Sequence, residues 1–294
     1  MDMRGRTVVV TGATNGLGLA SAVALGKAGA HLVLAGRDEG RGAAALATVR
    51  EQAPGVVART VALDLADLSS VRRCAEELRG ELSSLDVLMN NAGVMMPPQR
   101  RETVDGFELQ MGTNHLGHAA LTLLLLPLLT ATPGSRVVTV SSLAARGGTI
   151  DLDDLQAERS YSPSPRYGAS KLANLLFTLE LQRRLVVAQA PTIAVAAHPG
   201  ISATGLVQTM ELGRVFERLS SVLSQSAEVG ARPQLHAATA DGVRGGDYYG
   251  PRGIAEVRGR KVTRATMPPK ALDTTTAARL WSLSEELTGV TSPV

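Results

Sequence analysis

The stretch that decides the fold is Thr7-Val8-Val9-Val10-Thr11-Gly12-Ala13-Thr14-Asn15-Gly16-Leu17-Gly18. The β-branched run at its start is typical of a buried parallel strand, and a helical pattern from Leu19 to Ala28 follows the glycines. Strand, glycine-rich turn and helix N-terminus together form a phosphate cradle, because glycines let the backbone approach an anion that free helix N–H groups bind. The spacing is G-x-x-x-G-x-G, not the general G-x-G-x-x-G fingerprint, and a simple tight βα connection would also fit this turn.

Strand and helix patterns alternate along the rest of the chain. Apolar and β-branched runs predict further strands at residues 31–35, 56–63, 85–89, 136–140, 192–197 and 247–250. Helical periodicity predicts helices at residues 39–53, 69–82 (opened by Ser69 or Ser70), 107–129, from Tyr167 to about 185, and 226–240. The repeated βαβ order with short turns predicts an α/β fold, a single doubly wound (Rossmann-type) parallel sheet with helices on both faces.

The sequence indicates one domain over residues 1–294, because no repeat or low-complexity linker divides it. Residues 201–225 show neither the hydrophobic periodicity of a strand nor that of a helix. They follow the carboxyl end of a strand, where substrate loops lie in such sheets. Their bulky apolar side chains favour a lipophilic substrate, unless they pack a helical lid onto the domain without contacting substrate. A terminal helix at about 274–288 is capped by Asp273 or Thr274 and ended by Gly289.

The composition of the chain indicates which partners and which cellular compartment to expect. The net charge is only +3, and no basic run is long enough to follow a phosphate backbone, so we expect no nucleic-acid binding. Cys74 is the only cysteine, which fits a reducing compartment. The chain starts without an apolar signal segment, and its richest apolar run, residues 119–129, is too short to span a bilayer. These features predict a cytoplasmic protein with no membrane span.

Two other kinds of active centre have weak support in the sequence. His115 and His118 are three residues apart in the helix predicted at 107–129, but no third ligand is near, so we expect no metal site. Neither Ser142 nor Ser170 lies in the G-x-S-x-G turn of a hydrolase.

Tyr167 and Lys171 stand at the start of an apolar helical run. Positions four residues apart lie on one face of a helix, so the phenol and the ammonium can face the same cleft. A tyrosine has an unperturbed pKa of about 10, and a nearby cation favours the phenolate and lowers that pKa. A tyrosine tuned in this way can serve as a general acid/base. The pair alone is not specific, because a core Tyr beside a surface Lys has the same spacing.

The end of the second strand, Gly36-Arg37-Asp38, bears on the choice of coenzyme. An acidic residue at this place binds the 2′-hydroxyl of an adenosine ribose and favours NAD, whereas an arginine accommodates a 2′-phosphate. Gly36 holds the first position and Arg37 the next, so we predict NADP(H). Asp38 keeps NAD(H) open, because its carboxylate could serve the ribose, and Arg37 could also be a solvated loop residue.

In combination, these motifs resemble the short-chain dehydrogenase/reductase family over roughly residues 6–250. The motifs that carry the resemblance occur in the family's order: Thr11-Gly12-x-x-x-Gly16-x-Gly18, Asp64, Asn91-Ala92-Gly93, Asn114, Ser142, Tyr167-x-x-x-Lys171 and Pro199-Gly200. Ser170-Lys171-Leu172-Ala173-Asn174 is similar to the retinol-dehydrogenase-like branch, and so is the pairing of Ser141-Ser142 with residues 154–158.

The resemblance implies a role for each matching residue. Tyr167 would exchange a proton with the substrate oxygen, and Lys171 would hold the nicotinamide ribose and lower the pKa of Tyr167. Ser142, rather than the adjacent Ser141, would stabilise charge on the substrate oxygen. Asn114 would support a proton-relay water and distort its helix. The coenzyme-binding residues would be Gly12, Thr14, Asn15, Gly16, Leu17, Gly18, Arg37, Asp64, Leu65, Asn91, Ala92, Gly93, Tyr167, Lys171, Pro199, Gly200, Ile201 and Thr204.

The expected function is an NADP(H)-dependent oxidoreductase that interconverts a carbonyl and an alcohol on a small lipophilic molecule. NADP rests on Arg37 alone, because Asn15 stands where some NADP-preferring family members carry a basic residue. The resemblance also makes a homo-oligomer an expectation, although no residue fixes a subunit count. The alternative is a catalytically silent dinucleotide-binding sensor or interaction protein, but a sensor needs no proton donor and the catalytic set is intact. Sugar-nucleotide epimerase or dehydratase chemistry is disfavoured by the glycine spacing and the modest C-terminal region.

Overall fold

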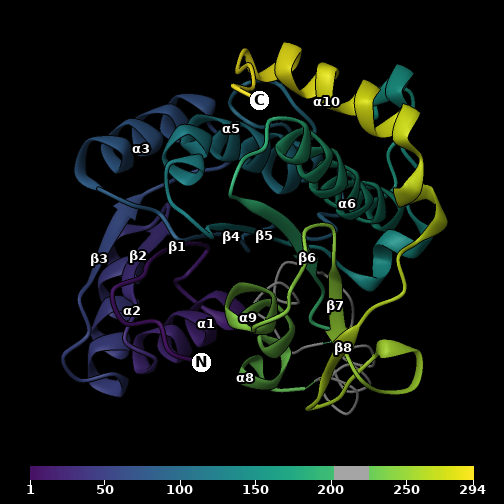
Figure 1. The fold of residues 1–294 in the computed structure, drawn as a ribbon. Coiled ribbons are helices and arrows are strands. Elements are labelled where there is room, and N and C mark those ends of the chain that lie inside the picture. Colours follow the sequence, from purple (N-terminus) through teal and green to yellow (C-terminus); the bar gives the residue numbers. More distant parts are fainter. Residues whose placement is uncertain (202–224) are drawn as a thin grey trace.

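One sheet of eight strands runs through the computed structural model, which describes residues 1–201 and 225–294 (Figure 1). The strand order is β3-β2-β1-β4-β5-β6-β7-β8. Neighbouring strands are parallel, except that β8 is antiparallel to β7. The bounds are β1 Thr7–Thr11, β2 His31–Gly36, β3 Ala58–Ala62, β4 Val87–Asn90, β5 Arg136–Val140, β6 Ile193–Ala197, β7 Tyr248–Pro251 and β8 Val262–Arg264.

The helices connect these strands and cover the sheet. The α-helices are α1 Gly16–Lys27, α2 Glu39–Gln52, α3 Leu68–Glu81, α4 Leu109–Met111, α5 Gly117–Thr130, α6 Pro163–Val187, α8 Ala227–Gly230, α9 Arg232–Thr239 and α10 Thr274–Thr288. The shorter turns are the π-helical η1 Gly112–Leu116 and the 3₁₀ segments η2 Leu143–Gly147, η3 Leu152–Asp154, η5 Ile254–Glu256 and η6 Pro269–Leu272. None of the described helices is long and apolar enough to cross a membrane.

Both faces of the sheet are buried. Alternate residues of a strand point to opposite faces, so one strand contributes side chains to two clusters. Val8 and Val10 pack in a cluster with residues of α1, α2 and α9, whereas Val9 packs in a second cluster with residues of α3, α5, α6 and α10. Figure 1 shows these two layers of helices on either side of the sheet. The predicted doubly wound parallel sheet with helices on both faces is therefore confirmed.

The terminal helix α10 packs on the outside of α5 and α6 (Figure 1). Trp281 stacks on Phe177 of α6, with ring centroids 5.2 Å apart, and the Arg184 guanidinium lies 4.4 Å from the Trp281 ring centroid. The helix is capped by the carboxylate of Asp273 and ends at Gly289, which has a φ of +60°. A glycine adopts this left-handed conformation without steric cost, which explains where the helix stops.

Four details differ from the elements that the sequence predicts. The helix predicted at 107–129 begins as α4 and passes through the π-helical η1 before α5. Asp67, not Ser69 or Ser70, caps α3. The helix predicted at 226–240 is two helices, α8 and α9, because Pro233 has no N–H to continue the hydrogen-bond ladder. The strand predicted at 247–250 is followed by β8, which was not predicted.

The only thiol of the chain is part of the packed interior. Cys74 lies on α3 with a side chain that is 2% exposed, in the same cluster as Val9. Burial raises the pKa of this thiol to about 12. Because the thiolate is the reactive form, Cys74 acts as a small apolar group.

Candidate active site

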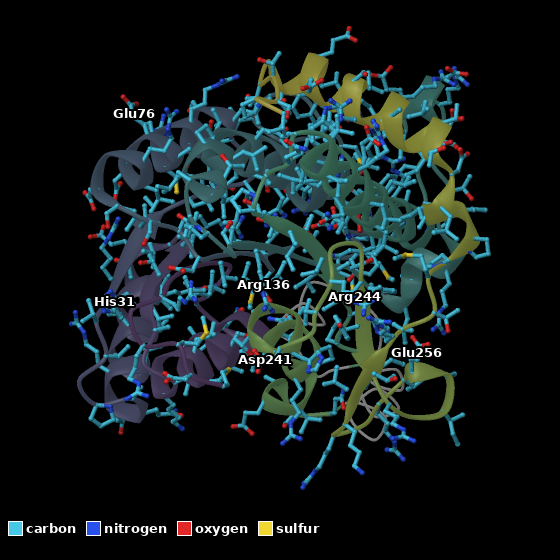
Figure 2. The ribbon with its side chains drawn as sticks, viewed as in Figure 1. His31, Glu76, Arg136, Asp241, Arg244 and Glu256 are labelled. Atoms are coloured by element: carbon cyan, nitrogen blue, oxygen red, sulfur yellow. The ribbon has the colours of Figure 1, made fainter. Side chains whose placement is uncertain are left out.

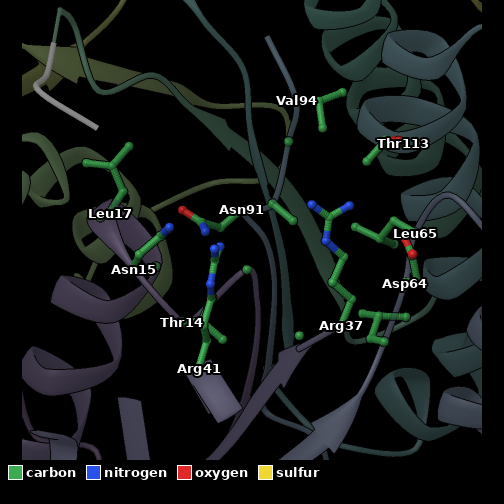
Figure 3. A pocket seen from close by; sticks show the side chains of 17 residues that line it. Thr14, Asn15, Leu17, Arg37, Arg41, Asp64, Leu65, Asn91, Val94 and Thr113 are labelled. Atoms are coloured by element: carbon green, nitrogen blue, oxygen red, sulfur yellow. The ribbon is translucent and has the colours of Figure 1, made fainter. Parts of the chain in front are cut away.

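A cleft opens at the carboxyl edge of the sheet between β1 and β4, where the strand order reverses (Figure 3). Ligands bind open α/β sheets at such switch points. Twelve of the predicted coenzyme-binding residues line it: Gly12, Thr14, Asn15, Gly16, Leu17, Gly18, Arg37, Asp64, Leu65, Asn91, Ala92 and Gly93. Five other residues line the cleft but are not among the predicted coenzyme-binding residues: Gly36, Arg41, Leu63, Val94 and Thr113.

The glycine-rich turn approaches its neighbours so closely that side chains would not fit. Gly12 has a φ of +64°, and a Cβ on it would lie 2.9 Å from Cα of Ala92. A Cβ on Gly18 would lie 2.2 Å from the carbonyl oxygen of Gly12. The N-cap of α1, Asn15, makes no side-chain capping hydrogen bond. The first N–H groups of α1 are therefore left without a capping side chain and can receive an anion.

We expect Gly18→Ala to weaken NADPH binding about tenfold and to lower the free energy of unfolding by about 2 kcal/mol, because the new methyl would collide with fixed backbone. Calorimetric titration with NADPH and urea denaturation measure the two effects. Gly80→Ala on α3 is the matched control, since a Cβ at Gly80 meets nothing within 4 Å. Unchanged NADPH affinity in Gly18→Ala would mean that this turn does not cradle the coenzyme.

Thr11 joins the end of β1 to β4 and to the helix that carries Asn114. Its hydroxyl oxygen accepts hydrogen bonds from the N–H groups of Asn91 at 2.9 Å and Ala92 at 3.0 Å. The same oxygen lies 2.9 Å from Nε2 of His118, whose Nδ1 lies 3.0 Å from the carbonyl oxygen of Asn114. Burial lowers the pKa of His118 to about 3, so the ring is neutral. A carbonyl only accepts, so Nδ1 carries the proton and Nε2 accepts from the Thr11 hydroxyl.

Two guanidinium groups point into the cleft near the end of β2 (Figure 3). Arg37 directly follows β2, and Arg41 lies in the first turn of α2. Within the described part of the chain, Arg37 makes no ion pair, and Arg41 only approaches Asp38 at 3.8 Å. Asp38 caps α2 by accepting from the Arg41 N–H at 2.8 Å, and it does not line the cleft. This geometry disfavours the alternative in which Asp38 binds a ribose.

Thr113 of η1 presents an unsatisfied polar group in the cleft wall. Its hydroxyl is buried and finds no hydrogen-bond partner among the residues that the structure describes. A buried hydroxyl without a partner costs free energy, so this oxygen fits a polar group of a ligand. A glycine cradle, two guanidinium groups and this hydroxyl together suit a phosphate-bearing dinucleotide.

Of the cleft residues that were not predicted, Arg41 could have been found from the sequence, and Thr113 could not. Arg41 falls in the first turn of a predicted helix directly after a strand end, so the same reasoning that selected Arg37 could have found it. Thr113 sits inside a helical run and carries no such signal, because only the path of the π-helical turn brings it to the cleft.

Asn114 lies in η1, so the helix is distorted where the family resemblance implies a distortion. Its side-chain oxygen accepts from the N–H of Val94 at 2.8 Å, and its side-chain nitrogen donates to the Val94 carbonyl at 3.0 Å and to Oγ of Ser170 at 2.9 Å. The Ser170 hydroxyl donates to the carbonyl of Tyr167 at 2.9 Å. Asn114 therefore fastens the cleft wall to α6. π-helical turns often occur at functional sites.

The two adjacent serines after β5 have different surroundings. Ser141 is buried, and its hydroxyl donates to the carbonyl of Lys171 at 2.8 Å, so it anchors α6. Ser142 is half-buried and accepts from the N–H of Ala144 at 3.2 Å. It also shares a side-chain hydrogen bond with Tyr167. Ser142 is thus the serine of this pair that accompanies the phenol.

Tyr167 and Lys171 are both buried one turn apart on α6, with Nζ of Lys171 5.8 Å from the Tyr167 ring centroid. Burial raises the pKa of Tyr167, and its hydrogen bond with Ser142 only partly offsets this. Burial lowers the pKa of Lys171 to about 8, and its Nζ donates to the carbonyl of Val140 at 3.1 Å. The expectation that the pKa of Tyr167 is lowered is therefore wrong for the protein alone, because desolvation of the phenolate dominates.

The coenzyme cleft and the Tyr167 group adjoin at Gly93. Gly93 lines the cleft, and a Cβ on it would lie 3.0 Å from Oδ1 of Asn114 and 3.5 Å from Nζ of Lys171. The absence of a side chain here leaves the space between cradle and ammonium open. The structure thus brings the four predicted catalytic residues to one end of the cleft.

The remaining predicted coenzyme residues follow β6. Pro199, Gly200 and Ile201 lie at the same edge of the sheet but do not line the described cleft. Gly200 has a φ of +69°, and the Ile201 N–H donates to the carbonyl of Val257 at 2.7 Å. Thr204 and nearly all of the segment predicted to be a substrate loop lie outside the described residues. Their roles stay predictions.

His115 and His118 contact the hydroxyl groups of different residues. Nε2 of His115 lies 2.9 Å from Oγ of Ser284 on α10, whereas His118 meets Thr11. In residues 1–201 and 225–294, no group of three His, Cys, Asp or Glu side chains is placed to hold a metal ion.

Comparison with known proteins gives consistent matches over nearly the whole chain. Residues 6–214 match a family model described as short chain dehydrogenase. Human retinol dehydrogenase 12 is 40% identical over 292 residues, covering 99% of this chain and 88% of that protein. Mouse polyprenol dehydrogenase is 40% identical over 296 residues, covering 97% of this chain and 84% of that protein. A crystal structure of an uncharacterised protein from Mycobacterium paratuberculosis has a TM-score of 0.83 and 44% identity, covering 100% of this chain and 97% of that one.

Proposed function

The chain belongs to the short-chain dehydrogenase family and is an NAD(P)-dependent dehydrogenase or reductase, and from this we propose that it interconverts carbonyls and alcohols of lipophilic molecules with NADP(H). Tyr167 is the general acid/base in this proposal. The observation that carries it is the junction at Gly93, where the cleft lined by the glycine-rich turn meets the buried ammonium of Lys171.

The surroundings of Tyr167 suit a proton donor to a carbonyl. A bound nicotinamide coenzyme supplies a hydride to the substrate carbon or accepts one from it. Tyr167 gives its proton to the carbonyl oxygen in reduction and takes it back in oxidation. Because burial raises its pKa, the phenol is protonated at neutral pH and is ready to act as the acid. The Ser142 hydroxyl beside it supports the charge that develops on the substrate oxygen.

Lys171 and Asn114 position the groups around Tyr167. Among residues 1–201 and 225–294, the Lys171 ammonium makes one hydrogen bond, to the carbonyl of Val140. An ammonium has three donors, so Lys171 keeps donors for a ribose hydroxyl and for the phenol. Asn114 hydrogen-bonds both Val94 of the cleft wall and Ser170 of α6, so it connects the cleft wall to the helix that carries the proton donor.

The preference for NADP(H) is supported by two arginines rather than one. The side chains of Arg37 and Arg41 point into the cleft where a dinucleotide fold reads the adenosine ribose (Figure 3). Guanidinium groups bind phosphate through paired, charge-assisted hydrogen bonds. A 2′-phosphate between them would neutralise two like charges, whereas a bare 2′-hydroxyl would leave them unpaired.

Two observations support a lipophilic substrate. The similar proteins include a retinol dehydrogenase and a polyprenol dehydrogenase, and both names specify apolar alcohols. Residues 201–225 of this chain, which follow the catalytic edge of the sheet, contain Leu206, Val207, Met210, Leu212, Val215, Phe216, Leu219, Val222 and Leu223.

The direct test is coenzyme oxidation by the purified protein with NADPH and with NADH, against aldehydes and ketones of increasing chain length. We expect turnover with NADPH that exceeds turnover with NADH and that rises with the apolar surface of the carbonyl compound. Equal rates with both coenzymes would contradict the NADP preference. A preference for short polar carbonyls would contradict the lipophilic substrate, and tight NADPH binding without turnover of any carbonyl would favour the sensor alternative.

A further inference from the structure

The hairpin segment from the last residue of β7 to the end of β8, residues 251–264, carries charge that the catalytic site does not use. It holds one acidic residue, Glu256, and five basic residues: Arg252, Arg258, Arg260, Lys261 and Arg264. Arg264 pairs with Asp247 at 3.2 Å. The other four basic side chains are exposed and make no ion pair within residues 1–201 and 225–294. Figure 2 shows nitrogen-tipped side chains that project into solvent around this hairpin.

The hairpin also presents an apolar side chain to water. Ile254, at the start of η5, is 95% exposed, more than any other large apolar side chain among the described residues. A single exposed apolar residue is ordinary by itself. Ile254 is unusual because exposed cations, which make no ion pair with the described residues, lie before and after it on a backbone that is held in place.

The contacts of Glu256 hold that backbone. Ala255 and Glu256 have φ values of +52° and +60°, which side-chain-bearing residues adopt only when surrounding contacts hold them. The Glu256 carboxylate (Figure 2) lies 3.0 Å from Nε2 of His198 and 2.7 Å from the Arg146 guanidinium, and it accepts from the Thr266 N–H at 3.0 Å. These contacts fix the turn that points Ile254 outward.

The hairpin borders the catalytic end of the molecule. The carbonyl of Val257 accepts from the N–H of Ile201, just after the predicted coenzyme-binding Pro199-Gly200, at 2.7 Å. Arg146, which pairs with Glu256, is in η2, the turn that begins directly after Ser142. In Figure 1 the hairpin lies at the opposite edge of the sheet from β3. A partner that covers the hairpin would therefore sit beside the segments that follow Ser142 and Gly200.

We propose that residues 251–264 dock the protein onto an anionic lipid surface, with Ile254 entering the interface and Arg252, Arg258, Arg260 and Lys261 meeting lipid phosphates or carboxylates. Four exposed cations that pair with no acidic side chain among the described residues repel one another, and an anionic surface relieves that repulsion. Basic residues near such a surface attract it by about 1 kcal/mol each, and an inserted apolar side chain adds to this.

A membrane fits this surface better than an acidic protein does. Specific protein interfaces need a sizeable, shaped apolar centre, whereas the hairpin offers one isoleucine and long, exposed basic side chains. A lipid surface accepts cations without fixed geometry. The placement also brings the catalytic end to the phase in which a lipophilic alcohol or aldehyde dissolves, and this second point rests on the proposed function.

Flotation with vesicles of phosphatidylcholine, with and without phosphatidylserine, tests the docking without requiring turnover. We expect the wild-type chain to float with vesicles that contain phosphatidylserine and to remain in the bottom fraction with phosphatidylcholine alone. High salt should release the chain from the phosphatidylserine vesicles. The triple variant Arg258→Ala/Arg260→Ala/Lys261→Ala should partition about 100-fold less. Ile254→Ser should reduce partitioning about tenfold and leave the salt dependence unchanged.

Matched controls separate this hairpin from charge in general. Arg79→Ala/Arg101→Ala removes two exposed arginines outside the hairpin, and Val187→Ser removes an apolar side chain that is 75% exposed at the end of α6. Both should float like wild type. Failure of the wild type to float, or equal loss in the controls, would overturn the proposal. Hairpin-dependent binding to poly-glutamate without binding to vesicles would assign the surface to an acidic polypeptide instead.

A turnover assay with two substrate forms links docking to activity. The triple variant should reduce a long-chain aldehyde dissolved in anionic vesicles more slowly than wild type, and a water-soluble aldehyde at the wild-type rate. If neither aldehyde reacts with the wild type, the proposed function fails while the flotation result stands by itself.

Discussion

Tyr167→Phe will reduce carbonyl turnover by about 10²- to 10⁴-fold, which is the range that general acid catalysis contributes, and will leave NADPH affinity within a few-fold of wild type. The variant removes only the phenol oxygen. The ring is buried, so its packing on α6 is retained, while the substrate oxygen loses its proton donor. Steady-state NADPH oxidation measures the loss, and titration of coenzyme fluorescence measures the affinity.

Tyr161→Phe is the control for this experiment, because it makes the same chemical change just before α6. The Tyr161 hydroxyl donates to the carbonyl of Pro97 at 2.7 Å, and this residue has no place at the Gly93 junction. We expect it to keep turnover near wild type. Wild-type turnover in Tyr167→Phe would remove Tyr167 from the mechanism, and equal losses in both variants would point to a general loss of structure near α6.

Arg37→Asp will weaken NADPH binding by about 10²- to 10³-fold, because it replaces a charge-assisted pair with phosphate by a like-charge repulsion. NADH carries no 2′-phosphate, so its affinity should stay the same or rise as the new carboxylate meets a ribose hydroxyl. Arg41→Ala should shift the ratio in the same direction by a smaller factor, because one guanidinium remains. The ratio of kcat/KM for the two coenzymes is the measurement.

Arg79→Asp controls for the change in net charge, since Arg79 is an exposed residue of α3 that does not line the cleft. It should leave the coenzyme ratio unchanged. If Arg37→Asp weakened NADPH and NADH equally, Arg37 would be a structural residue, and the choice of coenzyme would have to be explained by other residues.

The sheet and the coenzyme cleft could be predicted from the sequence because their signals are local. A strand buried on both faces is a continuous apolar run, as in Val8-Val9-Val10, and a glycine is needed wherever backbones approach as closely as at Gly12 and Gly18. These features depend on a few adjacent residues. The order of the motifs along the chain then matched that of a known family.

The missed features depend on contacts between distant segments. β8 is three residues long, Val262-Thr263-Arg264, and is a strand only because the backbone of β7 pairs with it. Thr113 reaches the cleft through a π-helical turn. The pKa of Tyr167 illustrates the same limit, because the sequence shows the neighbouring Lys171 but not the depth of burial that raises this pKa.

The single buried thiol makes this chain a ready background for spectroscopic labels. Cys74 is inaccessible and stays protonated at the pH of maleimide coupling, so the natural sequence needs no cysteine removal before labelling. A cysteine introduced by Ile254→Cys would be the sole reactive sulfur of the folded protein. An environment-sensitive dye attached there would report the depth of the hairpin in a lipid layer in real time, with the catalytic residues untouched.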